Sequence, residues 1–170
     1  MEHQDILLTY AEVAAAFAGF SAIVSSFAEN RRSKNLRINH YRIKVMIEYS
    51  LCVVIFAFLP TLLVLFFEME DAAWRLSSAV LIVVWGIIAL LSATRARAVL
   101  GVWGFSVAAG FSYSMLVLTL LGITVLGLSV LGIHVRSPAG SYLIGLFFPL
   151  LQSAFYFLHI VTYSEPFDEE

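Results

Sequence analysis

Charged residues and cysteine are both scarce in this sequence, and each scarcity excludes a class of protein. Only 13% of the 170 residues are charged and 61% are hydrophobic, whereas soluble globular domains have about 25% and roughly 45–50%. A soluble domain of this length could not bury so much apolar surface, so the excess must face lipid. Cys52 is the only cysteine, which excludes a disulfide framework within the chain and a thiolate metal site. The composition therefore indicates an integral membrane protein.

The N-terminus lacks the positive charge of a cleavable signal peptide. Residues 1–5 contain two acids and neither lysine nor arginine, and the apolar run that follows extends to Ala28. That run is too long for the apolar core of a signal peptide, and the basic residues come after it. We therefore expect this segment to be a retained membrane helix.

Apolar runs long enough to cross a membrane recur along the chain. A helix needs about 20 mostly apolar residues to cross a hydrocarbon core of ~30 Å. The uncharged stretch between Arg97 and Arg136 is too long for one crossing at ~1.5 Å per residue. We divide it into a short interfacial helix at residues 98–109 and a crossing, with one long tilted helix as the alternative. The sequence predicts a single domain, an all-α polytopic transmembrane helical bundle of five spans at residues 6–28, 45–67, 76–92, 110–133 and 141–163.

The basic residues are unevenly distributed among the expected loops. The loop at residues 29–44 is strongly basic, the next connection is mainly acidic, and the third carries Arg95 and Arg97. Short loops rich in lysine and arginine stay in the cytoplasm. We therefore expect a multi-pass protein of a bacterial inner membrane, with the N-terminus outside and the acidic tail at residues 164–170 in the cytoplasm. Six basic residues of the first loop are expected to lie against anionic lipid headgroups: Arg31, Arg32, Lys34, Arg37, Arg42 and Lys44.

Glu12 is the most informative polar residue, because it lies inside the first expected span. A carboxylate there is costly unless it is paired, protonated or hydrated, and such acids often mark ion or proton paths. Glu12, Ser21 and Gln152 are therefore candidates for an intramembrane ion or proton site. The alternative is a neutral Glu12 carboxyl that is hydrogen-bonded to a neighbouring helix. The Gln152 amide is expected to face another helix or a second subunit.

Small residues occupy two faces of the same expected helix. One face carries Glu12 with Ala15, Ala16 and Gly19, and the other carries Ser21 with Ala14, Ala18 and Ser25. Small residues let helix backbones approach closely within a bilayer. We therefore expect this helix to be central and packed on two sides, with Glu12 directed into the bundle or towards the axis of an oligomer.

Glu48 and His159 are expected at similar depth near the inner surface, where they could form a hydrogen-bonded pair. Two alternatives remain open at this point. Glu48 could form an ion pair with Lys44, one turn earlier on the same helix, and His159 could simply reach the headgroups.

Signatures of catalysis are lacking. No aspartate lies inside an expected span, and the four histidines are scattered along the chain, whereas metal sites need clustered ligands. No histidine lies at the expected depth of a serine nucleophile with an acid behind it. The sequence therefore predicts a protein that is not an enzyme and has no cofactor, no metal and no nucleic-acid partner.

The first two expected helices contain several short motifs: Glu12, the stretch Gly19–Val24, the pairs Tyr41-Arg42 and Ser50-Leu51, and the pair Leu59-Pro60. Together these motifs resemble a widespread group of small, functionally uncharacterised bacterial polytopic membrane proteins. The resemblance covers less than half of the chain. It implies a bacterial membrane protein, and it supplies no substrate, cofactor or catalytic residue.

Three functions fit these observations. The first is a small membrane protein that self-associates and provides a path or site for a small ion or protons, because five short helices can scarcely enclose a solute site alone and a symmetric oligomer can. The second is a non-transporting accessory or scaffold subunit of a larger membrane complex. The third is a sensor of membrane lipid or pH that uses the basic loop. The expected partners are the lipid bilayer and either further copies of the chain or another membrane protein.

Overall fold

The computed structural model describes residues 2–29, 36–66, 70–133 and 137–162. For residues 2, 25–29, 36–39, 99–109 and 112 it describes the backbone alone. The described residues are almost entirely helical and contain no strand. They form α1 (Glu2–Glu29), α2 (Leu36–Phe66), α3 (Glu70–Leu131) and α4 (Pro138–Thr162).

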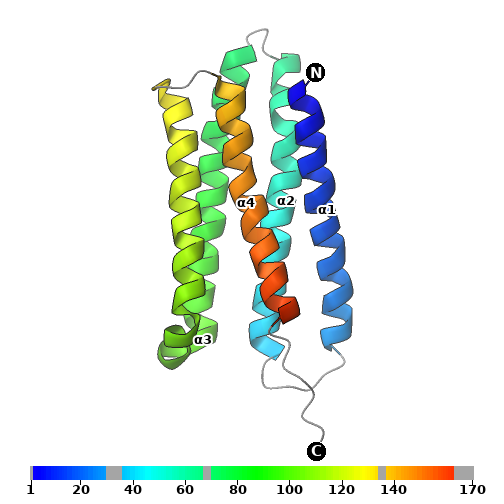
Figure 1. Ribbon diagram of the computed structural model, residues 1–170, viewed down its shortest axis with the longest axis vertical. Coiled ribbons are helices and arrows are strands. Elements are labelled where there is room, and N and C mark those ends of the chain that lie inside the picture. Colours follow the sequence, from blue (N-terminus) through cyan, green and yellow to red (C-terminus); the bar gives the residue numbers. More distant parts are fainter. Residues whose placement is uncertain (1, 30–35, 67–69, 134–136, 163–170) are drawn as a thin grey trace, which may run out of the picture.

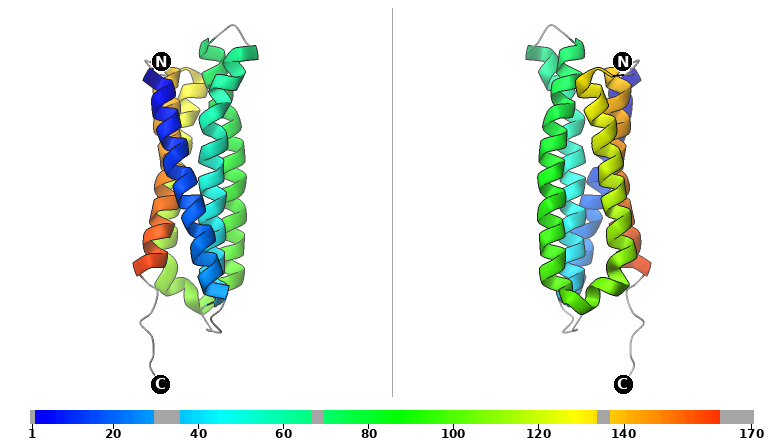
Figure 2. Two further views of the ribbon diagram at one scale, coloured as in Figure 1. Left: turned by 90° about the vertical axis from the view of Figure 1, so that its right-hand side faces the viewer. Right: turned by 90° about the vertical axis from the view of Figure 1, so that its left-hand side faces the viewer.

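The long helix α3 does not run straight but folds back on itself. A straight helix of its 62 residues would be about 93 Å long at ~1.5 Å per residue. Instead, two limbs lie side by side and the chain turns between them at one end of the bundle (Figures 1 and 2). The Trp85 ring in the first limb lies directly against Gly122 in the second. The uncharged stretch therefore does not form one long tilted helix, and its apolar segment long enough to cross a membrane is Tyr113–Leu131.

The described residues thus contain five apolar helical segments long enough to cross a membrane: His3–Val24, His40–Phe66, Glu70–Ala98, Tyr113–Leu131 and Pro138–Thr162. This agrees with the expected five-span helical bundle. The third segment extends beyond the expected 76–92, because the polar residues that flank its apolar run continue the helix. After five passes the start of α1 and the end of α4 lie at opposite ends of the bundle (Figure 1).

The two ends of the bundle differ in charge. The end at which α1 finishes and α2 begins also holds the turn of α3 (Figure 2), and it carries His40, Lys44, Arg95 and Arg97. We call it the basic end. The opposite end, which holds His3, Glu70 and Asp71, is called the N-terminal end.

The core lies between α2, α3 and α4. The side chains of Trp85, Tyr142 and Leu146 are fully buried, and two glycines allow the helices to approach closely. A Cβ atom added at Gly122 would lie 2.3 Å from the Trp85 ring, and one added at Gly145 would lie 2.3 Å from the Leu126 side chain. Large side chains therefore fill the space that the glycines leave, as expected of tightly packed membrane helices.

Helix α1 lies at the edge of the bundle. It packs against α2 and α4 through Leu7, Ala11 and Ala14, which are buried. The expectation of a central first helix is therefore corrected, because the opposite side of α1 has no neighbour among the described residues. That side is free to meet lipid or another protein.

Candidate functional site

Glu12 lies on the outer surface of the bundle, well inside the first span. It follows His3 by nine residues, which corresponds to about 14 Å along the helix axis. Its side chain is exposed, and no described residue forms a hydrogen bond or ion pair with it. In a single chain this carboxyl would face lipid, which is unfavourable unless it is protonated, hydrated or paired.

The residues that share a side with Glu12 are small and exposed. Ala15, Ala16 and Gly19 all face away from the bundle, and a Cβ atom added at Gly19 would meet nothing within 4 Å. We call these three residues together with Glu12 the Glu12 face. Within one chain this face packs against none of the described residues, although its composition suits close helix packing.

The other set of small residues does pack. Ala14 is fully buried and Ala18 is half-buried. The Ser21 hydroxyl is buried and donates a hydrogen bond of 2.6 Å to the carbonyl of Ala18, so it is satisfied within its own helix. The side chain of Ser25 lies outside the described part of the chain.

Gln152 is fully buried where α4 meets both limbs of α3. Its amide nitrogen donates to the carbonyl of Met115 at 2.9 Å and to the hydroxyl of Thr119 at 2.8 Å. Its amide oxygen accepts from the indole nitrogen of Trp85 at 3.1 Å. The expectation that this amide faces another helix is met within one chain. Because both amide protons and the oxygen are engaged, Gln152 acts as a structural link between helices.

The three candidates for an ion site are therefore not brought together. Glu12 lies on the outside of α1, Ser21 is turned towards the neighbouring helices, and Gln152 bonds to α3. The described contact between α1 and α3 is the ring contact of His3 with Trp74 at the N-terminal end, away from these three residues. Ser21 and Gln152 both have hydrogen-bond partners. Glu12 is the one of the three whose side chain has no such partner among the described residues.

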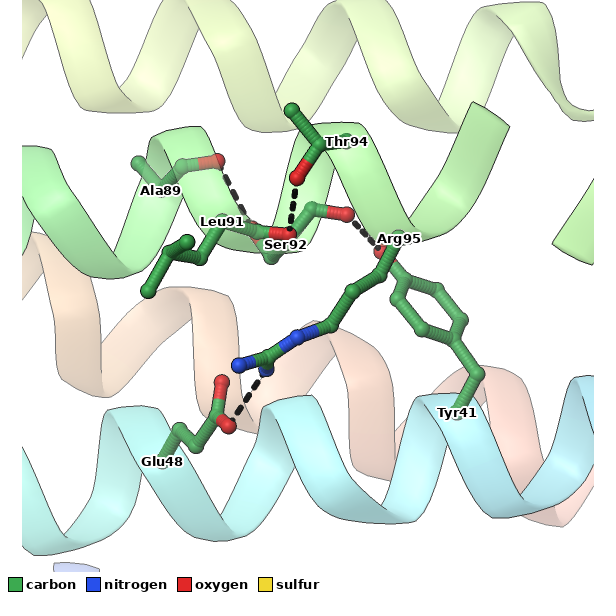
Figure 3. A network of polar contacts seen from close by, with 7 residues as sticks. All are labelled: Tyr41, Glu48, Ala89, Leu91, Ser92, Thr94 and Arg95. Atoms are coloured by element: carbon green, nitrogen blue, oxygen red, sulfur yellow. Dashed lines mark hydrogen bonds and ion pairs between the residues drawn. The ribbon is translucent and has the colours of Figure 1, made fainter. Parts of the chain in front are cut away.

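Glu48 is bound by Arg95 rather than by either partner expected from the sequence. The Arg95 guanidinium donates to the Glu48 carboxylate at 2.5 Å and so links α3 to α2 (Figure 3). Nearby, the Tyr41 hydroxyl of α2 donates to the carbonyl of Ser92 of α3 at 3.0 Å (Figure 3). These two contacts fasten α2 to the first limb of α3 at the basic end. The sequence could not identify Arg95 as the partner, because the two residues are 47 positions apart.

His159 lies at the basic end but packs against an aromatic ring. Its imidazole lies 4.6 Å from the Phe111 ring, centroid to centroid. Arg42 is close enough to exert an electrostatic effect on it. The structure therefore does not bring Glu48 and His159 together as a pair, because Glu48 is bound by Arg95 and His159 packs against Phe111.

The expected lipid-facing basic residues are only partly described. Arg42 is half-buried and Lys44 is exposed near the start of α2. Arg31, Arg32 and Lys34 fall outside the described residues, as does the acidic tail, and only the backbone is described for Arg37. The described pair shows that two nearby cations of one helix have different surroundings.

Several of the other residues that sequence reasoning missed are aromatic. Trp85, Tyr41 and Tyr142 each donate a hydrogen bond between helices. One of these bonds had a signal in the sequence. Pro60 lacks the amide that would bond to the carbonyl of Phe56, so a donor from elsewhere was required. The Tyr142 hydroxyl supplies it at 2.6 Å.

No family model matches the chain, and no curated protein and no solved structure matches it either. Within the described residues, no three histidine, cysteine, aspartate or glutamate side chains are grouped to hold a metal ion. The Glu12 face therefore remains the strongest candidate for a functional site.

Proposed function

We propose that the protein self-associates in the membrane through the Glu12 face, and that the Glu12 carboxyls of adjacent copies form a site for a proton or a small cation. The observation that carries the proposal is the position of Glu12, which is exposed and inside a membrane span. Such a group needs a partner that the chain itself does not provide among its described residues.

The interior of a single bundle offers little support for an ion path. Large side chains such as Trp85 and Tyr142 are fully buried there, and its central amide, Gln152, is engaged at both nitrogen and oxygen. Polar groups that bond to one another in this way stabilise the contact between helices. This favours a site between copies over a site inside one copy.

The small residues of the Glu12 face favour a further helix as the neighbour of α1. Ala16 and Gly19 follow Glu12 at the i+4 and i+7 positions, which lie on one side of a helix. A symmetric contact between copies would repeat the same surface on each and would bring the Glu12 residues towards one another. Two adjacent carboxyls share a proton readily, because both cannot remain charged at low cost.

The charge distribution supports an orientation for this assembly. Arginine and lysine side chains gather at the basic end, so we place that end at the cytoplasmic face and the N-terminal end outside. A bacterial inner membrane suits this arrangement, in keeping with the motifs of the first two helices.

Flux through liposomes tests the ion site. Purified protein is reconstituted, a pH or cation gradient is imposed, and decay is followed with an internal dye. We expect Glu12→Gln to abolish flux, because an amide neither binds a proton nor carries charge. The matched control Asp5→Asn makes the same change at an exposed acid of α1 nearer the helix start and should retain flux.

An accessory role is the competing function for the same face. A partner protein would then supply the cation or donor that Glu12 needs. Purification in mild detergent separates the two: a single homo-oligomer supports the proposal, whereas a foreign membrane protein in fixed stoichiometry, with no flux, contradicts it.

A further inference from the structure

Arg42 is a cation without a described counter-ion near the start of the second span. It follows His40, where the apolar part of α2 begins, and its side chain is half-buried. Glu48, on the same helix, is already bound by Arg95, and no other described carboxylate pairs with Arg42. A guanidinium does not lose its proton in proteins. The described residues therefore leave this charge available to an anion from outside them.

Two side chains of α4 lie within electrostatic range of this guanidinium. Tyr156 and His159 of α4 both lie close enough to interact electrostatically with Arg42. Phe111 of α3 packs against both of them, with centroid distances of 5.0 Å to Tyr156 and 4.6 Å to His159. The half-buried Arg42 thus lies near the place where α3 and α4 pack together at the basic end.

The charge around the junction is positive. Lys44 and Arg97 are exposed at the same end, and the described side chains there include a single carboxylate, Glu48. An anion approaching the basic end is therefore attracted over a distance of about 8–10 Å at physiological salt. Arg42 differs from Lys44 and Arg97 because its side chain is half-buried, whereas theirs are exposed.

Depth and geometry together select the anion. The start of an apolar span corresponds to the level of the lipid headgroups, where arginine side chains commonly reach the phosphates. The planar fork of a guanidinium matches the oxygens of a phosphate, to which it can donate two hydrogen bonds. A phosphate ester at this depth is most readily supplied by the bilayer itself.

We infer that Arg42 binds the phosphate of an anionic phospholipid at the junction of α2, α3 and α4. The bound headgroup compensates the buried charge, and it holds the ends of α2 and α4 together. This site is separate from the Glu12 face, so either can fail without the other.

Lipid titration of the purified full-length protein tests this site. The protein in a non-ionic detergent is titrated with phosphatidylglycerol or phosphatidylcholine, and bound lipid is counted by native mass spectrometry. We expect a clear preference for phosphatidylglycerol, because the choline of the other lipid offsets the charge of its phosphate. Arg42→Gln should lower the apparent affinity for phosphatidylglycerol about tenfold, as expected for the loss of one charged hydrogen bond.

Lys44→Gln is the matched control, because it removes the same charge two residues away from an exposed position. It should change the affinity less than about twofold, as exposed ion pairs contribute little, and Arg42→Lys should retain part of the binding. Equal losses in the two glutamine variants would show a diffuse surface charge and overturn the proposal. No preference for phosphatidylglycerol in the unaltered protein would overturn it even if Arg42→Gln does not fold.

A soluble phosphate could in principle supply the same chemistry. Inorganic phosphate and glycerol phosphate are therefore added as competitors at fixed phosphatidylglycerol. We expect weak displacement, since neither is concentrated at the membrane surface. Displacement at the same concentration as the lipid would assign the site to a soluble phosphate and contradict a lipid ligand.

Discussion

The hydroxyl of Tyr142 donates a hydrogen bond of 2.6 Å to the carbonyl of Phe56, the group that Pro60 leaves without a helical donor. A proline inside a membrane helix can open a backbone site for a transported ion. Here the freed carbonyl is buried and bonded to a neighbouring helix. The proline of α2 is therefore part of the packing between α2 and α4.

Removal of the Tyr142 hydroxyl should destabilise the bundle through this carbonyl. We expect Tyr142→Phe to lower the free energy of unfolding by about 1–2 kcal/mol, because a buried acceptor loses its donor. Unfolding in mixed micelles, followed by circular dichroism, measures the change. Tyr113→Phe alters an exposed tyrosine and should have little effect. If Pro60→Ala restores the helical amide, the loss on Tyr142→Phe should shrink in that background; an undiminished loss would contradict this role.

Gly122 should tolerate no side chain, because the Trp85 ring occupies the space beside it. A Cβ atom there would lie 2.3 Å from the ring, so Gly122→Ala should cost about 1–3 kcal/mol of stability by overpacking. At Gly127, on the same limb of α3, a Cβ atom would meet nothing within 4 Å. Gly127→Ala should therefore be neutral or stabilising by up to about 1 kcal/mol. The same unfolding measurement checks both, and equal effects would show that the two limbs are not packed as described.

The Glu48–Arg95 pair should depend on charge complementarity. Arg95→Glu places two carboxylates together and should lower stability by about 1 kcal/mol. Adding Glu48→Arg exchanges the partners and should recover much of that loss. In 1 M salt both the loss of stability and its recovery should be smaller, because salt shortens the range of electrostatic interactions to about 3 Å. A double variant no more stable than Arg95→Glu alone would argue against the pair.

The number of spans followed from the sequence, because an apolar run of sufficient length must cross the bilayer whatever its neighbours are. The grouping of Glu12 with Ala15, Ala16 and Gly19 also followed, since helical periodicity alone determines it. Periodicity does not say whether that face points inward or outward. In the structure, the side of α1 that carries Leu7, Ala11 and Ala14 packs against α2 and α4, and the Glu12 face therefore points outward.

Contacts between segments far apart in the chain could not be predicted from the sequence. It indicated that Gln152 must bond to another helix, but Thr119 is its partner only because of the register between α3 and α4. The pairing of Glu48 with Arg95 likewise required α3 to fold back where it does. Such pairings are fixed by the packing of the whole bundle.

Cysteine cross-linking in native membranes tests most directly whether the Glu12 face meets a second copy. The native Cys52 is buried, and it is first replaced by serine. Ala16→Cys then places a thiol on the Glu12 face, and Val83→Cys places one on the exposed side of α3. Each position is 13 residues from the start of its span, so the two thiols lie at comparable depth.

Mild oxidation should yield a disulfide-linked dimer from Ala16→Cys and none from Val83→Cys. Adding Gly19→Leu should abolish the dimer. Within one chain the leucine side chain has open space, so it should leave the fold intact and push away only a second copy that packs closely on this face. A dimer from Val83→Cys alone, or none from Ala16→Cys, would contradict self-association through the Glu12 face.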